Sequence, residues 1–318
     1  MWSRFGDVKN YVEPFFGSGA VLLARPQVGS IETINDLDGF VANFWRSIKL
    51  SPGLTAEYAD QPVNENDLHA RHVWLVQRMD SLRSQLEGDP DWHDPKIAGF
   101  WVWGLACWIA GGFCSGKGPW WPNEEGQLVR IGDSGRGVKR QRVHLNHNGQ
   151  GVNRKLVHLG DNGQGVLQSR LLPWFNALAE RLRRVRVCSG DWSRVVSPTV
   201  TFKQGVTGVF LDPPYADTAN RDSDLYREDS LEVAHSVCDW AVANGDNPQL
   251  RIALCGYEGE HEMPPAWSVH SWDAGAGFGA QAVERSGNGE RERIWFSPAC
   301  EASRQGSLFE LIKEEEAS

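Results

Sequence analysis

The sequence predicts an α/β fold with a doubly wound, mostly parallel sheet and one inserted region. Short apolar segments alternate with amphipathic segments near both ends of the chain, which is the pattern of strands and helices around a parallel sheet. The middle of the chain differs, because it is basic and repetitive. With 318 residues, 41% of them hydrophobic and 23% charged, the chain is long enough for one large domain and a smaller unit.

The first elements are expected within residues 10–50. Residues 10–13 (NYVE) predict a short strand, and the glycine-containing turn at 14–19 (PFFGSG) leads into a helix at 20–24. Residues 30–36 predict a second strand, which ends at Asn-Asp. Residues 39–50 have helical spacing of apolar side chains and end before a Ser-Pro-Gly boundary. The chain therefore opens as strand, helix, strand, helix.

The middle region, residues 51–169, contains a polar helical stretch near 67–86 and a tryptophan-rich segment. Residues 97–116 carry no formal charge, but their five glycines and three tryptophans favour a buried helix followed by a turn over a membrane span. Three similar units with a period of 14 residues fill 129–166. Their Gly-rich and Asn-rich turns predict small β-hairpins or looped fingers.

The strand and helix alternation returns in the last part of the chain, from residue 170 onward. A buried strand in this part leads directly to Asp212, and a second strand leads to Gly190-Asp191-Trp192. The expected elements are a helix at 172–182, strands at 185–189 and 208–211, a helix at 230–244, and strands at 250–255 and 293–297.

Charge is distributed unevenly along the chain. The net charge is −9, yet residues 129–170 hold eight Lys or Arg against two Asp, a local balance of +6, so that the remainder is −15. Local positive charge is enough to neutralise phosphates, so this basic island is a candidate phosphate-facing surface. The alternative is a solvated hairpin array whose charge serves solubility.

The six cysteines lie far apart without a C-x-x-C pair, which predicts reduced thiols in a cytoplasmic protein. The first ten residues carry no secretory signal. Histidines recur at equivalent repeat positions, but no carboxylate or cysteine constellation accompanies them, so no metal is expected.

The turn around Gly17 and Gly19 is a candidate site for a nucleotide-like ligand, because glycines allow ligand atoms to approach the backbone. Asp36 at the end of the next strand fits a carboxylate that accepts both hydroxyls of a ribose. The alternative interpretations are a plain tight turn for the glycines and a helix cap for Asp36.

The most specific signal is Asp212-Pro213-Pro214-Tyr215, which follows the apolar residues 209–211. The two prolines fix the backbone and leave the Asp212 carboxylate and the Pro213 carbonyl as acceptors for an amino group. The Tyr215 ring offers a stacking face to a base taken out of the duplex.

These motifs together resemble the Dam-like, D12-class family of adenine-N6 DNA methyltransferases, particularly phage-type members. Residues 11–20 resemble the family's cofactor motif, 34–38 its ribose-binding motif, 212–215 its catalytic tetrapeptide and 292–295 a late strand motif. The resemblance implies a Rossmann-like fold, S-adenosylmethionine as cofactor, and direct methyl transfer to a flipped adenine in double-stranded DNA. It implies cofactor binding by Glu13, Pro14, Phe15, Gly17, Gly19, Asp36, Asp191, Trp192 and Asp212.

The resemblance also implies a division of the chain. Residues 1–50 and 170–300 form the catalytic domain, 51–169 a target-recognition insertion, and 301–318 a flexible acidic tail. Within that tail, the segment from Gln305 to Phe309 resembles the peptide with which bacterial replication proteins dock on the sliding clamp, although a chance match is the alternative. The residues expected to contact DNA are Lys117, Arg130, Arg136, Lys139, Arg140, Arg142, Arg154 and Lys155.

The implied role is that of a protective or post-replicative methylase in the cytoplasm of a bacterium or a phage-infected cell. Two other readings of the same fold remain. One is a methyltransferase acting on RNA adenine or on cytosine N4. The other is a DNA-binding protein that has lost its activity.

Overall fold

The computed structural model describes residues 1–108, 113–114, 120–122, 128–130, 167–214, 232–271 and 292–301. Several residues singled out above lie outside this part. They are Lys117, Arg136, Lys139, Arg140, Arg142, Arg154, Lys155, Tyr215, and the tail segment from Gln305 to Phe309. Arg130 is described only in its backbone, as the last residue of the short strand β4 (Leu128–Arg130), which pairs antiparallel with β3 (Trp120–Pro122).

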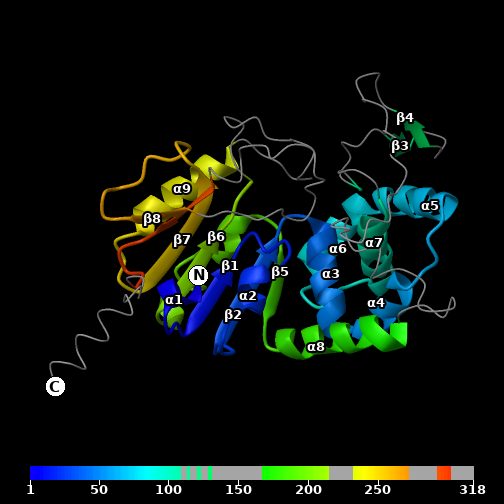
Figure 1. Ribbon diagram of the computed structural model, residues 1–318, viewed down its shortest axis with the longest axis horizontal. Helices are drawn as coiled ribbons and strands as arrows, with labels where there is room; N and C mark the ends of the chain where they lie inside the picture. Colours follow the sequence, from blue (N-terminus) through cyan, green and yellow to red (C-terminus); the bar gives the residue numbers. More distant parts are fainter. Residues whose placement is uncertain are drawn as a thin grey trace, which may run out of the picture.

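A seven-stranded sheet forms the centre of the molecule (Figure 1), in the order β5-β2-β1-β6-β7-β9-β8. The first five strands of this order are mutually parallel, whereas β9 runs antiparallel to both of its neighbours. The strands are β1 (Asn10–Glu13), β2 (Ile31–Asp36), β5 (Arg186–Ser189), β6 (Thr207–Leu211), β7 (Leu250–Tyr257), β8 (Ser268–Ser271) and β9 (Glu292–Phe296). The predicted doubly wound, mostly parallel sheet is confirmed.

Helices cover both faces of this sheet, because alternate residues of each buried strand point to opposite sides. On one face Tyr11 and Phe210 pack with side chains of four helices, among them Phe44 and Phe175. On the other face Val12 and its neighbours pack against α9 (Val233–Asn244). The four helices of the first face are α1 (Trp2–Phe5), α2 (Ala20–Leu23), α3 (Gly39–Leu50) and α8 (Leu172–Leu182).

Four further helices form a block beside α3 and α8, at the β5 end of the sheet (Figure 1). They are α4 (Pro52–Ala59), α5 (Glu65–Val76), α6 (Met79–Gly88) and α7 (Pro95–Cys107). Helix α7 packs tightly on α4, because a Cβ on Gly99 would lie 2.8 Å from the carbonyl oxygen of Thr55. Buried Arg46 ties the block to the sheet, because its guanidinium donates to the carbonyls of Val187, Asp89 and Trp92.

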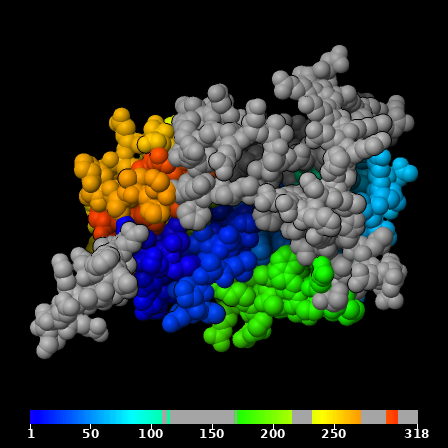
Figure 2. Space-filling model, in the orientation of Figure 1, coloured from blue at the N-terminus to red at the C-terminus, as the bar shows by residue number. Residues whose placement is uncertain are grey.

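A buried ion cluster joins segments that are far apart in the sequence. The carboxylate of Glu32 in β2 accepts two hydrogen bonds from Arg181 of α8, at 2.7 and 3.0 Å. It accepts a third from Arg25, at 3.0 Å. Figure 2 shows the surface of α8 in green bordering the blue N-terminal segments on one face of the molecule. Arg181 thus holds α8 against β2, and Arg25 holds the segment after α2 against the same strand.

Most elements lie where the sequence places them, and two predictions are wrong in detail. The helix expected near 67–86 is two helices, α5 and α6, separated at Gln77 and Arg78. The predicted end of the helix before Ser51-Pro52-Gly53 is confirmed, because α3 ends at Leu50 and Ser51 is not helical. A separate helix, α4, begins at Pro52, whose ring suits the first turn of a helix. The helix in the tryptophan-rich segment begins at Pro95 and ends at Cys107.

Within the described part of the chain, no helix combines the length and the apolar character that crossing a bilayer requires. All six cysteines lie in this part, and all are free thiols.

Candidate active site

The candidate site lies at the carboxyl ends of the parallel strands. From β1 the chain continues to β2 and β5 on one side, whereas β6 pairs with the opposite side of β1. The strand order therefore reverses between β1 and β6. In open α/β sheets, ligands bind in the crevice that such a reversal leaves beyond the strand ends. Glu13 ends β1 at this point, and Asp212 directly follows β6.

The turn after β1 is built from two glycines with left-handed backbone. Gly17 has φ of +46° and Gly19 has φ of +70°, a region that favours glycine. A Cβ on Gly17 would meet nothing within 4 Å, so the space in front of this residue is open to a ligand. A Cβ on Gly19 would lie 2.5 Å from the Phe16 ring instead. The first glycine thus leaves room outside the turn, and the second allows packing inside it.

Asp36 connects this turn to the end of β2. Its Oδ2 accepts the backbone N–H of Gly17 at 2.9 Å, and its Oδ1 accepts that of Asp38 at 2.9 Å. A carboxylate oxygen has two lone pairs and can accept more than one hydrogen bond. The structure therefore brings the predicted glycine turn and the predicted ribose acid together.

Asn35 is a buried polar residue that sequence reasoning missed. Its Nδ2 donates to the carbonyl of Pro14 at 3.1 Å and to that of Gly190 at 2.9 Å. One side chain thereby fixes the segments that follow β1 and β5 on either side of β2. Buried polar residues are hydrogen-bonded. No local signal in the sequence singled out Asn35, because other residues of the same strand are also polar, namely Glu32, Thr33 and Asp36.

Aromatic rings line the same edge of the sheet. The Phe15 and Trp192 rings lie 6.3 Å apart with a 30° tilt, and Trp240 of α9 meets Trp192 edge-on at 6.4 Å. Asp191 is exposed and caps the short helix that contains Trp192 by accepting the N–H of Ser193. The predicted Phe15 and Trp192 are therefore close together, and Trp240 was not anticipated.

Glu13 is the most unusual carboxyl group of the site. It is 2% exposed, and the hydroxyl of fully buried Tyr11 donates to its Oε2 at 2.8 Å. Burial is the main cause that raises the pKa of Glu13 to about 8. The charges of Asp212 and Asp36 add to this shift, and the hydrogen bonds from Tyr11 and the backbone of Leu22 oppose it. The three carboxyl groups are thus close enough to influence one another electrostatically.

The predicted tetrapeptide is described through its first three residues. Asp212 and Pro214 are partly exposed, and Pro213 is buried. Asp212 therefore reaches the surface of the crevice directly beyond a fully buried strand.

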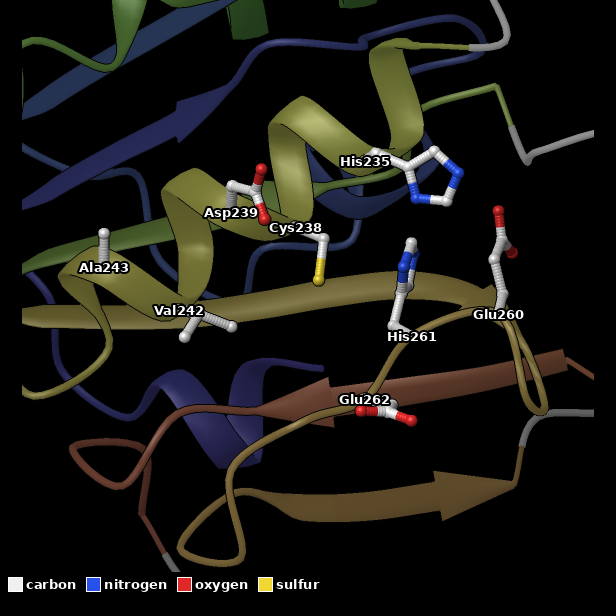
Figure 3. A pocket seen from close by; sticks show the side chains of 8 residues that line it. All are labelled: His235, Cys238, Asp239, Val242, Ala243, Glu260, His261 and Glu262. Carbon is white, nitrogen blue, oxygen red and sulfur yellow. The ribbon is translucent and has the colours of Figure 1, made fainter.

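A hollow of about 400 Å³ lies elsewhere, between α9 and the loop after β7 (Figure 3). His235 and His261 face each other across it, with ring centroids 6.3 Å apart. Burial is the main cause that lowers the pKa of His261, and His235 adds to it. None of the predicted site residues lines this hollow, so we assign the site to the strand ends. No group of three or more metal-ligating side chains occurs among the residues that the structure describes.

The fold and the site indicate the class of protein. It is a doubly wound α/β protein whose glycine turn, together with Asp36 at the end of β2, suits a ligand that contains a nucleoside. Residues 3–85, which extend from α1 into α6, match the family of D12 class N6 adenine-specific DNA methyltransferases. This match covers the N-terminal part of the chain and supports an adenine-N6 DNA methyltransferase activity. No curated protein matches the sequence. The matched segment contains Glu13, Gly17 and Asp36, whereas Asp212 lies beyond it.

Proposed function

We propose that the crevice between β1 and β6 binds S-adenosylmethionine and an adenine flipped out of double-stranded DNA, with Asp212 as the residue that engages the adenine amino group. The observation that carries this proposal is the position of Asp212. It follows β6 at the reversal of strand order, beside the strand end that holds Glu13 and the glycine turn.

The residues of the crevice suit this cofactor. The open space at Gly17 admits ligand atoms close to the backbone, and the Asp36 carboxylate beside it is an acceptor that suits the hydroxyls of a ribose. Phe15, Trp192 and Trp240 offer apolar surface for an adenine ring. The carboxyl groups of Glu13 and Asp212 give the crevice an affinity for cations. When bound, the cofactor supplies a methyl group activated by a sulfonium.

In this proposal the chain's own residues position the acceptor. The Asp212 carboxylate and the Pro213 carbonyl accept hydrogen bonds from the adenine amino group, which favours positive charge on that nitrogen as it is alkylated. Pro213 and Pro214 lack an N–H, so no backbone donor of theirs competes for these acceptors. Tyr215 supplies the stacking face for the flipped base. Most of the rate enhancement then comes from orientation.

The test is methyl transfer to unmethylated DNA, with the modified nucleosides identified by mass spectrometry. We expect N6-methyladenine as the product and a loss of at least about a hundredfold in kcat for Asp212→Asn. Asp94→Asn is a matched control, because Asp94 caps α7 in the helical block. N4-methylcytosine as the product, methylation of RNA alone, or full activity of the Asp212 variant would contradict the proposal.

We propose further that the basic insertion binds the DNA backbone. Its Lys and Arg residues (Arg130, Arg136, Lys139, Arg140, Arg142, Arg154 and Lys155) and Lys117 supply the positive charge that the rest of the chain lacks. Replacing Lys139, Arg140 and Arg142 by Gln should weaken DNA binding and reduce the slope of log K against log salt by about 0.9 per charge removed. An unchanged slope would leave these residues without a role in DNA binding.

The proposed setting is the cytoplasm of a bacterium or a phage-infected cell, where the DNA and a reducing environment are found together. Docking on a sliding clamp through the segment from Gln305 to Phe309 stays a prediction. Co-purification of the clamp with the full chain, but not with a Leu308→Ala, Phe309→Ala variant, would support it.

A further inference from the structure

Glu13 is a buried carboxyl group without a cationic partner. Its side chain is 2% exposed, and none of the ion pairs in the described part of the chain includes it. The other buried carboxylate among the described residues, Glu32, is neutralised by Arg25 and Arg181. A buried charge without a partner is costly, so a carboxyl group in this position is protonated or is kept for a cation that arrives later.

The groups that face Glu13 come from every element around it. Tyr11 of its own strand donates to Oε2, the backbone of Leu22 in α2 hydrogen-bonds to the carboxyl group, and Asp36 and Asp212 lie beyond the neighbouring strands. Cys255 of β7 is buried close by, and its thiol pKa is raised mainly by burial and also by the charges of Asp212, Glu292 and Glu13. Arg25 influences Tyr11, but its own guanidinium is bound to Glu32. Negative groups therefore outnumber positive ones around Glu13.

We propose that the free protein holds a proton on Glu13 and releases it when a cationic ligand occupies the crevice, so that cofactor binding is coupled to loss of one proton. This inference rests on the proposed function, because the cation in question is S-adenosylmethionine, which carries a sulfonium and an ammonium group. The proton leaves the carboxyl group for the solvent, and the resulting carboxylate faces the positive charge of the ligand. Tyr11 keeps its hydrogen bond to Oε2 throughout and orients the carboxyl group.

The coupling has a definite sign. With a pKa of about 8, Glu13 of the free protein is largely protonated at pH 7. If the cofactor binds only when Glu13 is ionised, the proton on Glu13 must first be lost, and this weakens cofactor binding at low pH. The affinity for the cofactor should therefore rise with pH by up to about tenfold per unit and level off above pH 8.

The experiment is isothermal titration calorimetry of the full chain with S-adenosylmethionine at pH 7, in buffers of different ionisation enthalpy. The dependence of the observed enthalpy on that of the buffer gives the number of protons released. We expect a value close to one at pH 7 and a value near zero above pH 9. Methylthioadenosine, which lacks both cationic groups, should bind without releasing a proton.

Two variants keep the test decisive. Glu13→Gln should abolish proton release. Tyr11→Phe removes the hydrogen bond that lowers the Glu13 pKa, and should move the pH at which release disappears upward. Cofactor binding without proton release, or equal release with methylthioadenosine, would overturn this inference and leave the proposed function intact. Absence of any cofactor binding by the unaltered chain would refute the proposed function itself.

Discussion

Gly17 donates its backbone N–H to Oδ2 of Asp36 across 2.9 Å, which joins the turn after β1 to the end of β2. The residues are 19 positions apart, and only the parallel pairing of β1 with β2 brings them together. The bond fixes the turn in the shape that leaves open space in front of Gly17. Asp36 thus has a structural role in addition to the proposed contact with a ribose.

Replacing Asp36 by Asn should raise the KM for the cofactor by about ten- to a hundredfold, since a hydrogen bond to a charged group is worth about 1.5–3 kcal/mol. The KM for DNA should change little. Steady-state kinetics with each substrate varied in turn gives both values. Asp94→Asn, at the N-cap of α7 away from the site, is the control. Equal effects on both KM values would argue for a general distortion instead.

The two glycines of the turn should respond differently to alanine. Gly17→Ala should cost about 1–2 kcal/mol of stability from the left-handed backbone alone, but should impair cofactor binding strongly because its methyl group fills the open space. Gly19→Ala should cost more stability, since its methyl group would displace the buried Phe16 ring from Trp45. Urea unfolding and calorimetry separate the two effects. A larger loss of stability for Gly17→Ala would contradict this assignment.

The ion cluster of Glu32 should be essential for stability. Glu32→Gln leaves Arg25 and Arg181 without their counter-charge in a buried position, which should lower the free energy of unfolding by about 3 kcal/mol or more. Glu180→Gln is the control, because its pair with Arg183 is exposed and should contribute less than about 1 kcal/mol. Urea unfolding of both variants measures the difference between their losses of stability. Equal losses for Glu32→Gln and Glu180→Gln would contradict a buried ion cluster at Glu32.

Packing of α7 against α4 depends on Gly99. A methyl group there would lie 2.4 Å from Cβ of Tyr58 and 2.8 Å from the backbone of α4, so Gly99→Ala should destabilise by about 1–3 kcal/mol. A methyl group on Gly88, at the end of α6, would meet nothing within 4 Å. Gly88→Ala should therefore leave the free energy of unfolding unchanged or raise it by up to about 1 kcal/mol. Thermal unfolding of the two variants should show shifts of unequal size.

Glu13 should make the stability of the free protein depend on pH. Its folded pKa of about 8 lies above the value of 4.5 expected for an unfolded chain, so the folded state binds the proton more tightly. Stability from this group is therefore fully present below pH 4.5 and is lost as the pH rises through 8, by up to about 1.4 kcal/mol per unit. Glu13→Gln should remove this slope in urea unfolding between pH 6 and 9. A variant with the same slope as the unaltered chain would refute the assignment.

The sequence by itself determined the elements with strong local signals. Alternating apolar runs located β1, β2, β6 and β7, and the helices α3 and α8 begin and end where their apolar spacing predicts. Those signals are local, because they arise from the periodicity of side chains and from the backbone preferences of Gly and Pro. The glycine turn, Asp36 and the residues from Asp212 onward were recognisable for the same reason.

Only the tertiary structure decided how these segments meet. The reversal of strand order between β1 and β6, the antiparallel position of β9 and the hydrogen bonds of Asn35 all depend on pairing between segments distant in the chain. The pKa of Glu13 depends on burial and on two carboxyl groups from other strands, which no local pattern encodes. The sequence therefore identified the chemical groups of the site, and their electrostatic coupling arose from the sheet that brings the strand ends together.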